Sequence, residues 1–180
     1  MKKRTFLAVA GAVVVSFALS TLPSSATPTP SPHSTTNPYG TGAIDPAGPN
    51  DAVLTLHNGT KKRSLTYKAL LEMHSSVITI YEPFVKKTQT FTVIPLSLLF
   101  NQVGIKGSDT VVTTALNAYG YTNKAVNFIR AQGYLAIKRG GLPIPYDEGG
   151  PIRLIYPKLS SWSKLLDPWN WSLSDISVKH

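Results

Sequence analysis

The sequence predicts one α+β domain with a curved or barrel-like mixed sheet and short helices. Several short segments alternate apolar with polar side chains or are rich in β-branched residues, which is typical of strands. The segments with helical spacing are few and short. They do not alternate regularly with the strands, as they would in a doubly wound α/β fold. This mixture favours the α+β class.

The first residues have the pattern of an export signal. Lys2-Lys3-Arg4 precedes an apolar run at residues 6–22, and Ser24-Ser25-Ala26 offers small residues where a signal peptidase cuts. We therefore expect residues 1–26 to be a signal peptide. The mature protein would then be secreted, periplasmic or associated with the cell envelope. The alternative is an uncleaved membrane anchor, which would be the chain's one attachment to a membrane.

Residues 27–50 have the composition of a tether. They are rich in Pro, Ser, Thr and Gly, and they lack the apolar side chains whose burial would offset the entropy of ordering. We expect this segment to be disordered and one domain to follow over residues 51–180. Loss of residues 1–26 removes two Lys and one Arg, which lowers the formal net charge from +9 to +6. The remaining positive charge favours a small anionic ligand or an envelope partner.

Two hairpins are predicted in the first half of the domain. Residues 53–57 have strand composition, and Asn58-Gly59 is a strong signal for a tight turn into a second strand at residues 61–64. Ser64 or Thr66 can cap a short helix that runs through Met73. Residues 77–81 and 88–94 predict strands that pair across residues 82–87. The cations at residues 61–63 indicate a solvated edge and not a nucleic-acid surface, because no aromatic residues alternate with them.

The second half of the domain contains the remaining predicted elements. Pro95 favours the start of a helix that Gly104 ends. A strand, a helix and another strand are then expected at residues 109–116, 124–132 and 133–137, followed by a turn at residues 139–141. Residues 143–147 are kept extended by prolines, and the Gly149-Gly150-Pro151 corner leads into a strand at residues 152–156. A helical turn at residues 160–166 and a closing strand at residues 169–178 complete the domain.

Arg153 is the residue that ordinary strand chemistry explains least. It is a lone arginine in the apolar segment Ile152-Arg153-Leu154-Ile155-Tyr156. The guanidinium is always charged and forms two parallel hydrogen bonds with a carboxylate or a phosphate. Arg153 therefore either forms a structural ion pair with Asp147 or Glu148, or it binds an anionic ligand.

The order of several motifs resembles a known family. The motifs are Ile94-Pro95-Leu96-Ser97-Leu98-Leu99, Ala115-Leu116-Asn117-Ala118-Tyr119, Gly140-Gly141-Leu142-Pro143, Gly149-Gly150-Pro151-Ile152-Arg153 and the terminal Trp171-x-Leu173-x-x-Ile176-x-Val178. In this order they resemble the oxidoreductase molybdopterin-binding domain of the sulfite oxidase family, in a short exported form. The resemblance covers about residues 53–178.

The resemblance implies a fold, a cofactor and a site. The fold would be the sulfite oxidase type of α+β domain, and the cofactor a molybdenum-pterin that supports oxygen-atom transfer. Arg153 and Gly150 would contact the pterin or its phosphate, and Asn117 and Tyr119 would lie near the pocket. Catalytic members bind molybdenum through a cysteine, and this chain has none. We therefore name no catalytic residue and no metal ligand.

Three functions follow from these expectations. The first is a non-catalytic or atypical binding module for a pterin or another small anionic ligand. The second is a molybdopterin-dependent oxidoreductase that works without a cysteine ligand. The third is a basic cell-surface interaction protein.

Other chemistries have little support. The four histidines show no spacing that would place two on one zinc ion, and the sequence has no Gly-x-Ser-x-Gly elbow, phosphate loop or dinucleotide fingerprint. Asp147 and Glu148 are adjacent, so an extended chain would direct them to opposite faces, unlike a glycosidase pair. Trp162, Trp169 and Trp171 either cover the end of the sheet or form a platform for a sugar or a partner.

Overall fold

The computed structural model describes residues 46–179. The predicted signal peptide and most of the predicted tether lie outside these residues. Residues 46–50, which we expected to belong to the tether, pack on the domain: Ala47 is buried, and the Pro49 carbonyl accepts a hydrogen bond from Lys68 N at 2.8 Å. The folded domain therefore begins before Asp51. None of the helices within residues 46–179 has the length and apolar character needed to span a bilayer.

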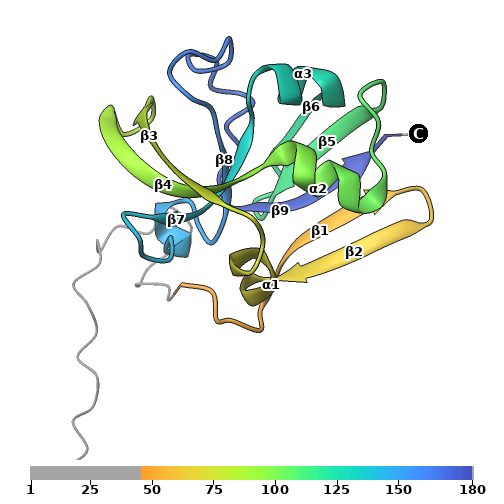
Figure 1. Cartoon of the computed structure of the whole chain (residues 1–180), viewed down its shortest axis with the longest axis horizontal. Helices are drawn as coiled ribbons and strands as arrows, with labels where there is room; N and C mark the ends of the chain where they lie inside the picture. The colour runs from red at the N-terminus through yellow and green to blue at the C-terminus, as the bar shows by residue number, and fades with distance from the viewer. Residues whose placement is uncertain (1–45, 180) are drawn as a thin grey trace, which may run out of the picture. The chain divides into compact units, whose positions relative to one another are not determined.

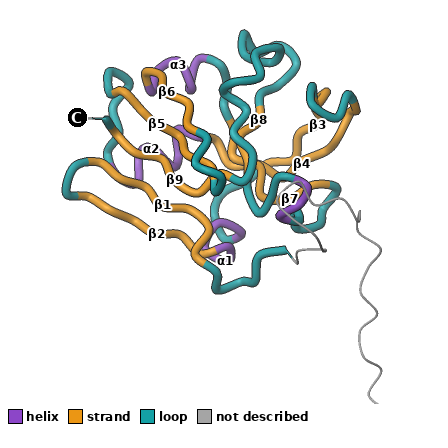
Figure 2. Tube along the Cα trace, turned by 180° about the vertical axis from the view of Figure 1, so that it is seen from behind, coloured by secondary structure: helices purple, strands orange, loops and turns teal. Residues whose placement is uncertain are grey.

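The first sheet has five strands and is mixed. Its order is β2 (Lys61–Thr66), β1 (Ala52–Asn58), β9 (Leu173–Val178), β5 (Thr110–Ala115) and β6 (Gly120–Lys124). Figure 2 shows these strands side by side; β1 and β9 are parallel, and all other pairs are antiparallel. The Asn58-Gly59 hairpin is confirmed. The closing strand begins at Leu173, later than expected, and β6 was not predicted.

The second sheet has four antiparallel strands. Its order is β3 (Ser76–Glu82), β4 (Lys87–Pro95), β7 (Tyr134–Arg139) and β8 (Arg153–Ile155). The predicted hairpin of β3 and β4 is confirmed, with Glu82 opposite Lys87. Figure 1 shows this hairpin curving away from the other strands at one side of the domain. The inner face of β3 carries Ile80 and Glu82, both buried, whereas Thr79 and Tyr81 are exposed on its outer face.

Three short helices connect the strands. The first, α1 (Tyr67–Leu71), is capped by Thr66, whose hydroxyl accepts a hydrogen bond from Ala69 N at 3.2 Å. The second, α2 (Leu96–Val103), follows Pro95 and ends at Gly104, which has a φ of 71° as the C-cap prediction required. The third, α3 (Ala125–Arg130), begins after Lys124 because that residue still belongs to β6. The helical turn expected at residues 160–166 takes the form of short hydrogen-bonded turns, in which Ser163 N donates to the Ser160 carbonyl and Leu165 N donates to the Trp162 carbonyl.

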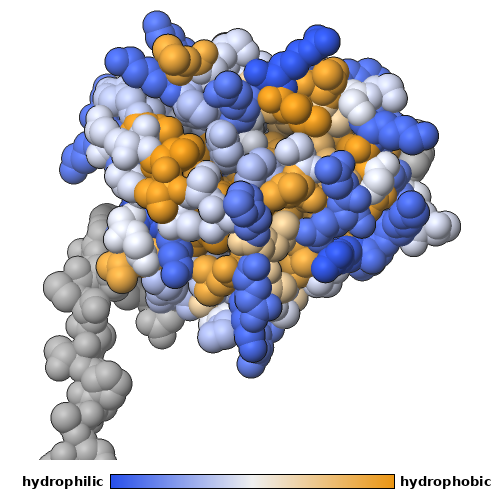
Figure 3. Space-filling view, in the orientation of Figure 1, coloured by the Kyte–Doolittle hydropathy of each residue, from blue (hydrophilic) through white to orange (hydrophobic). Residues whose placement is uncertain are grey.

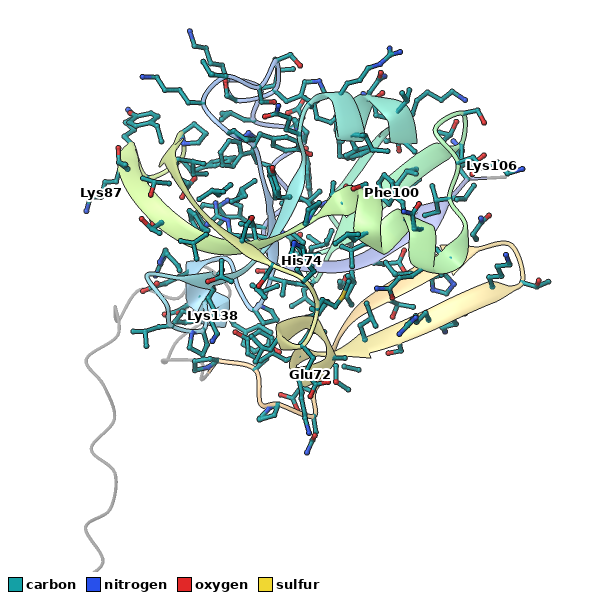
Figure 4. The ribbon with its side chains drawn as sticks, in the orientation of Figure 1. Glu72, His74, Lys87, Phe100, Lys106 and Lys138 are labelled. Carbon is teal, nitrogen blue, oxygen red and sulfur yellow. The ribbon has the colours of Figure 1, made fainter. Side chains whose placement is uncertain are left out.

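The core lies between the sheets and the helices. Phe100 of α2 points inward (Figure 4), and its ring lies 6.2 Å from that of Phe128 in an edge-to-face arrangement. The Phe128 ring also packs against the Trp162 ring. Trp162 packs against Tyr156, and Tyr156 packs against Trp169. The buried Trp162 and Trp169 thus belong to the core. Two curved sheets with three short helices confirm the α+β class.

Candidate functional site

The strand β8 is a sheet edge that other parts of the chain cover. All three of its residues are buried. The segment before β9 lies along it, because Leu154 N donates to the Asn170 carbonyl and Leu173 N donates to the Ile152 carbonyl, each at 2.9 Å. The edge is therefore closed to solvent, and any group on β8 is positioned by neighbours on several sides.

The Gly149-Gly150 corner is required by close contacts. Gly149 has a φ of +83°, and a Cβ placed there would lie 2.6 Å from Cε3 of Trp171. A Cβ at Gly150 would overlap the Ile144 carbonyl. Gly150 was expected to contact a cofactor, and the structure places it in the interior, against the backbone at Ile144.

Arg153 lies at the centre of a closed assembly. Its Nη2 is 3.1 Å from Oε1 of Glu82, and the two side chains are 1% and 0% exposed. The guanidinium carbon lies 3.9 Å from the ring centroid of Trp171 and 5.9 Å from that of Phe91, both within cation–π range. We call Arg153, Glu82, Trp171 and Phe91 the Arg153 centre. In it a buried charge is balanced by another buried charge and enclosed by aromatic rings.

The carboxylate partner of Arg153 differs from the expected one. We expected Asp147 or Glu148, but the short ion pair is with Glu82, at the end of β3. Glu148 instead forms an ion pair with Arg139. The 3-10 turn η1 (Tyr146–Glu148) replaces the extended backbone that the prediction assumed, and so redirects these carboxylates.

Asn117 and Tyr119 line an aromatic pocket of about 350 Å³. This pocket, which we call the aromatic pocket, is lined by Phe84, Ala115, Asn117, Tyr119, Leu166, Asp167, Trp169 and Trp171. Asn117 accepts a hydrogen bond from Tyr119 N at 3.1 Å, and the Tyr119 hydroxyl donates to the Asp167 carbonyl at 3.0 Å. Burial and the charge of Asp167 raise the pKa of Tyr119. Within residues 46–179, no cationic side chain belongs to the lining of this pocket.

The structure therefore brings together two of the four predicted site residues. Asn117 and Tyr119 share the aromatic pocket, whereas Arg153 and Gly150 do not line it. Trp171 separates the two groups, because its ring lies over Arg153 and also lines the pocket. The prediction that all four contact a cofactor remains a prediction.

A second pocket, of about 490 Å³, carries positive charge. We call it the lysine pocket, and its lining residues are Thr79, Ile80, Tyr81, Thr88, Lys158, Ser163 and Lys164. Two ammonium groups and four hydroxyl groups belong to these residues, and no carboxylate does. Thr79 and Thr90 are hydrogen-bonded across the hairpin at 2.9 Å, which orients this hydroxyl-rich face.

A third pocket, of about 600 Å³, has a mixed lining. We call it the Asp147 pocket, and it is lined by Val85, Lys87, Thr88, Gln89, Arg139, Asp147, Glu148 and Trp171. Burial lowers the pKa of Arg139, and the charges of Glu82 and Asp147 oppose this shift. Arg153 lines none of these three pockets.

Several of these residues were missed from the sequence. Glu82 had a usable signal, since it follows Ile78 and Ile80 on the inward-facing side of a strand, where an acidic residue needs a partner. Lys158 and Lys164 gave no such signal, because surface lysines are common.

The described residues do not form a metal site. Within residues 46–179, no group of three or more His, Cys, Asp or Glu side chains could hold a metal ion. His57 is instead 3.1 Å from Asp175. On the face shown in Figure 3, hydrophobic residues form several groups separated by hydrophilic residues.

Comparisons with known proteins agree with this fold. The sequence profile described as the oxidoreductase molybdopterin binding domain matches residues 50–168. The crystal structure of the sulfane dehydrogenase SoxCD from Paracoccus pantotrophus superimposes with a TM-score of 0.58 at 16% sequence identity. The match covers 77% of this chain and 40% of that one, so this chain spans less than half the length of its structural neighbour. A comparison with curated protein sequences found no match.

Proposed function

Because the chain belongs to the oxidoreductase molybdopterin binding domain family, we propose that it is a non-catalytic member that binds a small anionic ligand. One observation supports the proposal that this member is non-catalytic. The arginine that the resemblance directs to a cofactor is fully buried and paired with Glu82. Its positive charge is already balanced within the protein.

The donor set does not fit a molybdenum-pterin cofactor. The resemblance implies a cysteine thiolate on the metal, and the chain has no cysteine. It also implies a cationic contact for the pterin phosphate, yet Trp171 covers Arg153 and the aromatic pocket adds Asp167 but no cation. A phosphate would there meet a like charge and no compensating one. We therefore assign no oxygen-atom transfer step to this chain.

The lysine pocket supports the anion-binding part. Lys158 and Lys164 are exposed, so their ammonium groups can reorient toward a ligand. The hydroxyl groups of Thr79, Thr88 and Ser163 can donate to oxyanion oxygens. Because no carboxylate among the described residues lines this pocket, an anion would meet attraction without competing repulsion there.

We also propose that the protein functions outside the cytoplasm. Lys2-Lys3-Arg4, the apolar run that follows and the small residues before residue 27 support this proposal. An exported protein with this domain would meet phosphate, sulfate and sulfite in the periplasm or at the cell envelope. The test is pulse-chase labelling with detection of the mature N-terminus: cleavage after Ala26 is expected, and retention of the full chain in the cytoplasm would contradict export.

A calorimetric titration tests the proposed ligand. The exported chain is titrated at low ionic strength with inorganic phosphate, sulfate and sulfite, and we expect at least one to bind. Lys158→Ala and Lys164→Ala should each lower the affinity by about three- to tenfold, which is typical for loss of one charge-assisted contact. Lys106→Ala is the control, because Figure 4 shows Lys106 and the β3–β4 hairpin at opposite margins of the domain.

The titration tests the first of the three functions considered above, and the metal content tests the second. Binding that depends on Lys158 and Lys164 but not on Lys106 supports the anion module. Absence of binding by all three anions, or an equal loss in the Lys106→Ala control, contradicts it. Stoichiometric molybdenum in the protein would instead support an oxidoreductase.

A further inference from the structure

Asp147 is a buried acid that accepts no hydrogen bond from the described residues. It is 6% exposed, and neither carboxylate oxygen has a hydrogen-bond partner. Its charge acts on Arg139, but the ion pair of Arg139 is formed with Glu148. Removing a carboxylate from water without hydrogen bonds in return is costly, so almost all buried polar groups have partners. Asp147 is therefore a strong acceptor that the fold itself does not use.

Trp171 presents a matching donor. Its indole Nε1 is buried and donates to no acceptor among the described residues. The ring cannot turn easily, because Gly149 lies against one edge, the Arg153 guanidinium lies 3.9 Å from its centroid, and the Phe84 ring is 5.2 Å away. The N–H group is thus held in a fixed direction.

These two groups line the same pocket and are tied together by the backbone. Both belong to the lining of the Asp147 pocket, whose volume of about 600 Å³ is typical for a small ligand. Asp147 lies in the turn η1, which Gly149 ends in a left-handed conformation. Ser172 N donates to the Gly149 carbonyl at 2.9 Å, so the segments that carry Asp147 and Trp171 are joined directly. An acceptor and a donor therefore lie on directly joined segments that line one pocket.

The charges of the lining favour a neutral ligand. The lining contains two cations, Lys87 and Arg139, and two acids, Asp147 and Glu148. Arg139 and Glu148 neutralise each other. Lys87, which is exposed at the margin of the domain in Figure 4, has the charge that offsets Asp147. The pocket thus has no net formal charge that would select an anion or a cation.

We propose that the Asp147 pocket binds a neutral polyhydroxylated ligand, such as a saccharide. A hydroxyl group donates and accepts at once, so neighbouring hydroxyls can donate to Asp147 and accept from Trp171. Gln89 and Thr88 at the rim offer further hydrogen bonds of both kinds. This site shares Thr88 with the lysine pocket but none of its lysines, and its proposed ligand does not depend on the anion-binding function.

The test uses the indole resonance of Trp171 as its readout. The chain has 3 tryptophans, so the Trp171 N–H signal can be assigned by its loss in Trp171→Phe. Maltose, trehalose and the disaccharide of N-acetylglucosamine are added separately, with glycine and inorganic phosphate as charged probes. We expect at least one saccharide to shift this resonance. Asp147→Asn should weaken that binding about tenfold or more, as expected for loss of a hydrogen bond to a charged acceptor.

Matched variants separate this site from its neighbours. Asp167→Asn removes a carboxylate from the aromatic pocket, and Lys158→Ala removes a cation from the lysine pocket; neither should change saccharide binding. The proposal is overturned if no saccharide shifts the Trp171 resonance in the unmodified chain, a measurement that needs no variant to fold. It is also overturned if Asp147→Asn binds as tightly, or if glycine or phosphate alone produces the shift.

Discussion

The Arg153 centre and the lysine pocket place positively charged side chains in opposite environments. Arg153 is removed from water, paired with Glu82 and covered by Trp171. Lys158 and Lys164 remain exposed beside hydroxyl groups, with no carboxylate in the lining of their pocket. The first charge is balanced inside the protein, whereas the second is available to a ligand.

This difference shows why charge alone does not locate a binding site. A buried ion pair stabilises little in total, because desolvation offsets most of the attraction, but loss of one partner is costly. An exposed lysine contributes little to folding and remains free for an anion. Substitutions in the Arg153 centre should therefore affect mainly stability, and substitutions in the lysine pocket mainly binding.

Glu82→Ala should have the largest effect. It would leave Arg153 buried without its carboxylate and lower the free energy of unfolding by about 3–5 kcal/mol. Urea denaturation followed by tryptophan fluorescence measures this loss. Glu72→Ala is the control, because Glu72 is exposed and its 3.9 Å contact with Lys68 contributes little.

A double substitution tests whether the cost of Glu82→Ala comes from the buried charge of Arg153. Combining Glu82→Leu with Arg153→Met removes both charges, and stability should recover most of what Glu82→Ala loses. If Glu82→Ala costs less than about 1 kcal/mol, Arg153 retains another adequate partner and the description of a closed centre is wrong.

Gly149→Ala should have the next largest effect, because it pushes against the ring that covers Arg153. A Cβ would lie 2.6 Å from the Trp171 ring at a φ of +83°, which should cost roughly 1–3 kcal/mol in unfolding free energy. Gly140→Ala is a close control, since Gly140 also has a positive φ of +59° but no atom within 4 Å of the added carbon. Thermal unfolding of both variants isolates the contact with Trp171. Equal losses would show that this contact is unimportant.

Tyr156 directly follows β8 and is buried like the residues of that strand. Its buried hydroxyl should make the free energy of unfolding depend on pH. Burial raises the pKa of Tyr156 well above its ordinary value. The folded protein therefore keeps this proton when the unfolded chain releases it, and stability should fall as pH rises above about 10, by up to about 1.4 kcal/mol per pH unit. Tyr156→Phe should reduce that slope, and it should cost about 1 kcal/mol at neutral pH through the lost hydrogen bond to Pro168. An unchanged slope in alkaline unfolding experiments would contradict this assignment.

Lys158→Ala should have the smallest effect on stability. Because Lys158 is exposed, we expect the free energy of unfolding to change by less than about 0.5 kcal/mol while anion affinity falls. A loss of stability comparable to that of Glu82→Ala would remove the distinction between the two regions. Denaturation of the same preparation that is used for titration tests both effects together.

The parts of the fold that depend on local chemistry could be predicted from the sequence. The Asn58-Gly59 turn and the helix between Pro95 and Gly104 are each determined by a few neighbouring residues, and both are confirmed. The strand β6 was missed because its residues lack an apolar alternation, and it forms by pairing with β5. Residues 160–166 were expected to form a helical turn, and they form short hydrogen-bonded turns in which Trp162 packs among aromatic rings.

The site was less accessible to sequence reasoning than the fold. Arg153 was identified as a residue that needs an anion, but its partner Glu82 lies on a distant strand. Asn117 and Tyr119 were placed together because they are neighbours in one motif, and they share a pocket. The lysine pocket and the Asp147 pocket join segments that are far apart in sequence, so only the folded chain shows them.

The metal content of the exported protein tests the central claim most directly. The protein is purified from a host that synthesises the molybdenum cofactor, and molybdenum and pterin are measured by mass spectrometry and fluorescence. Because Glu82 already balances Arg153 and the chain has no cysteine, we predict that neither is present in stoichiometric amount. Stoichiometric molybdenum with pterin would contradict the account and show that this domain holds the cofactor in another way.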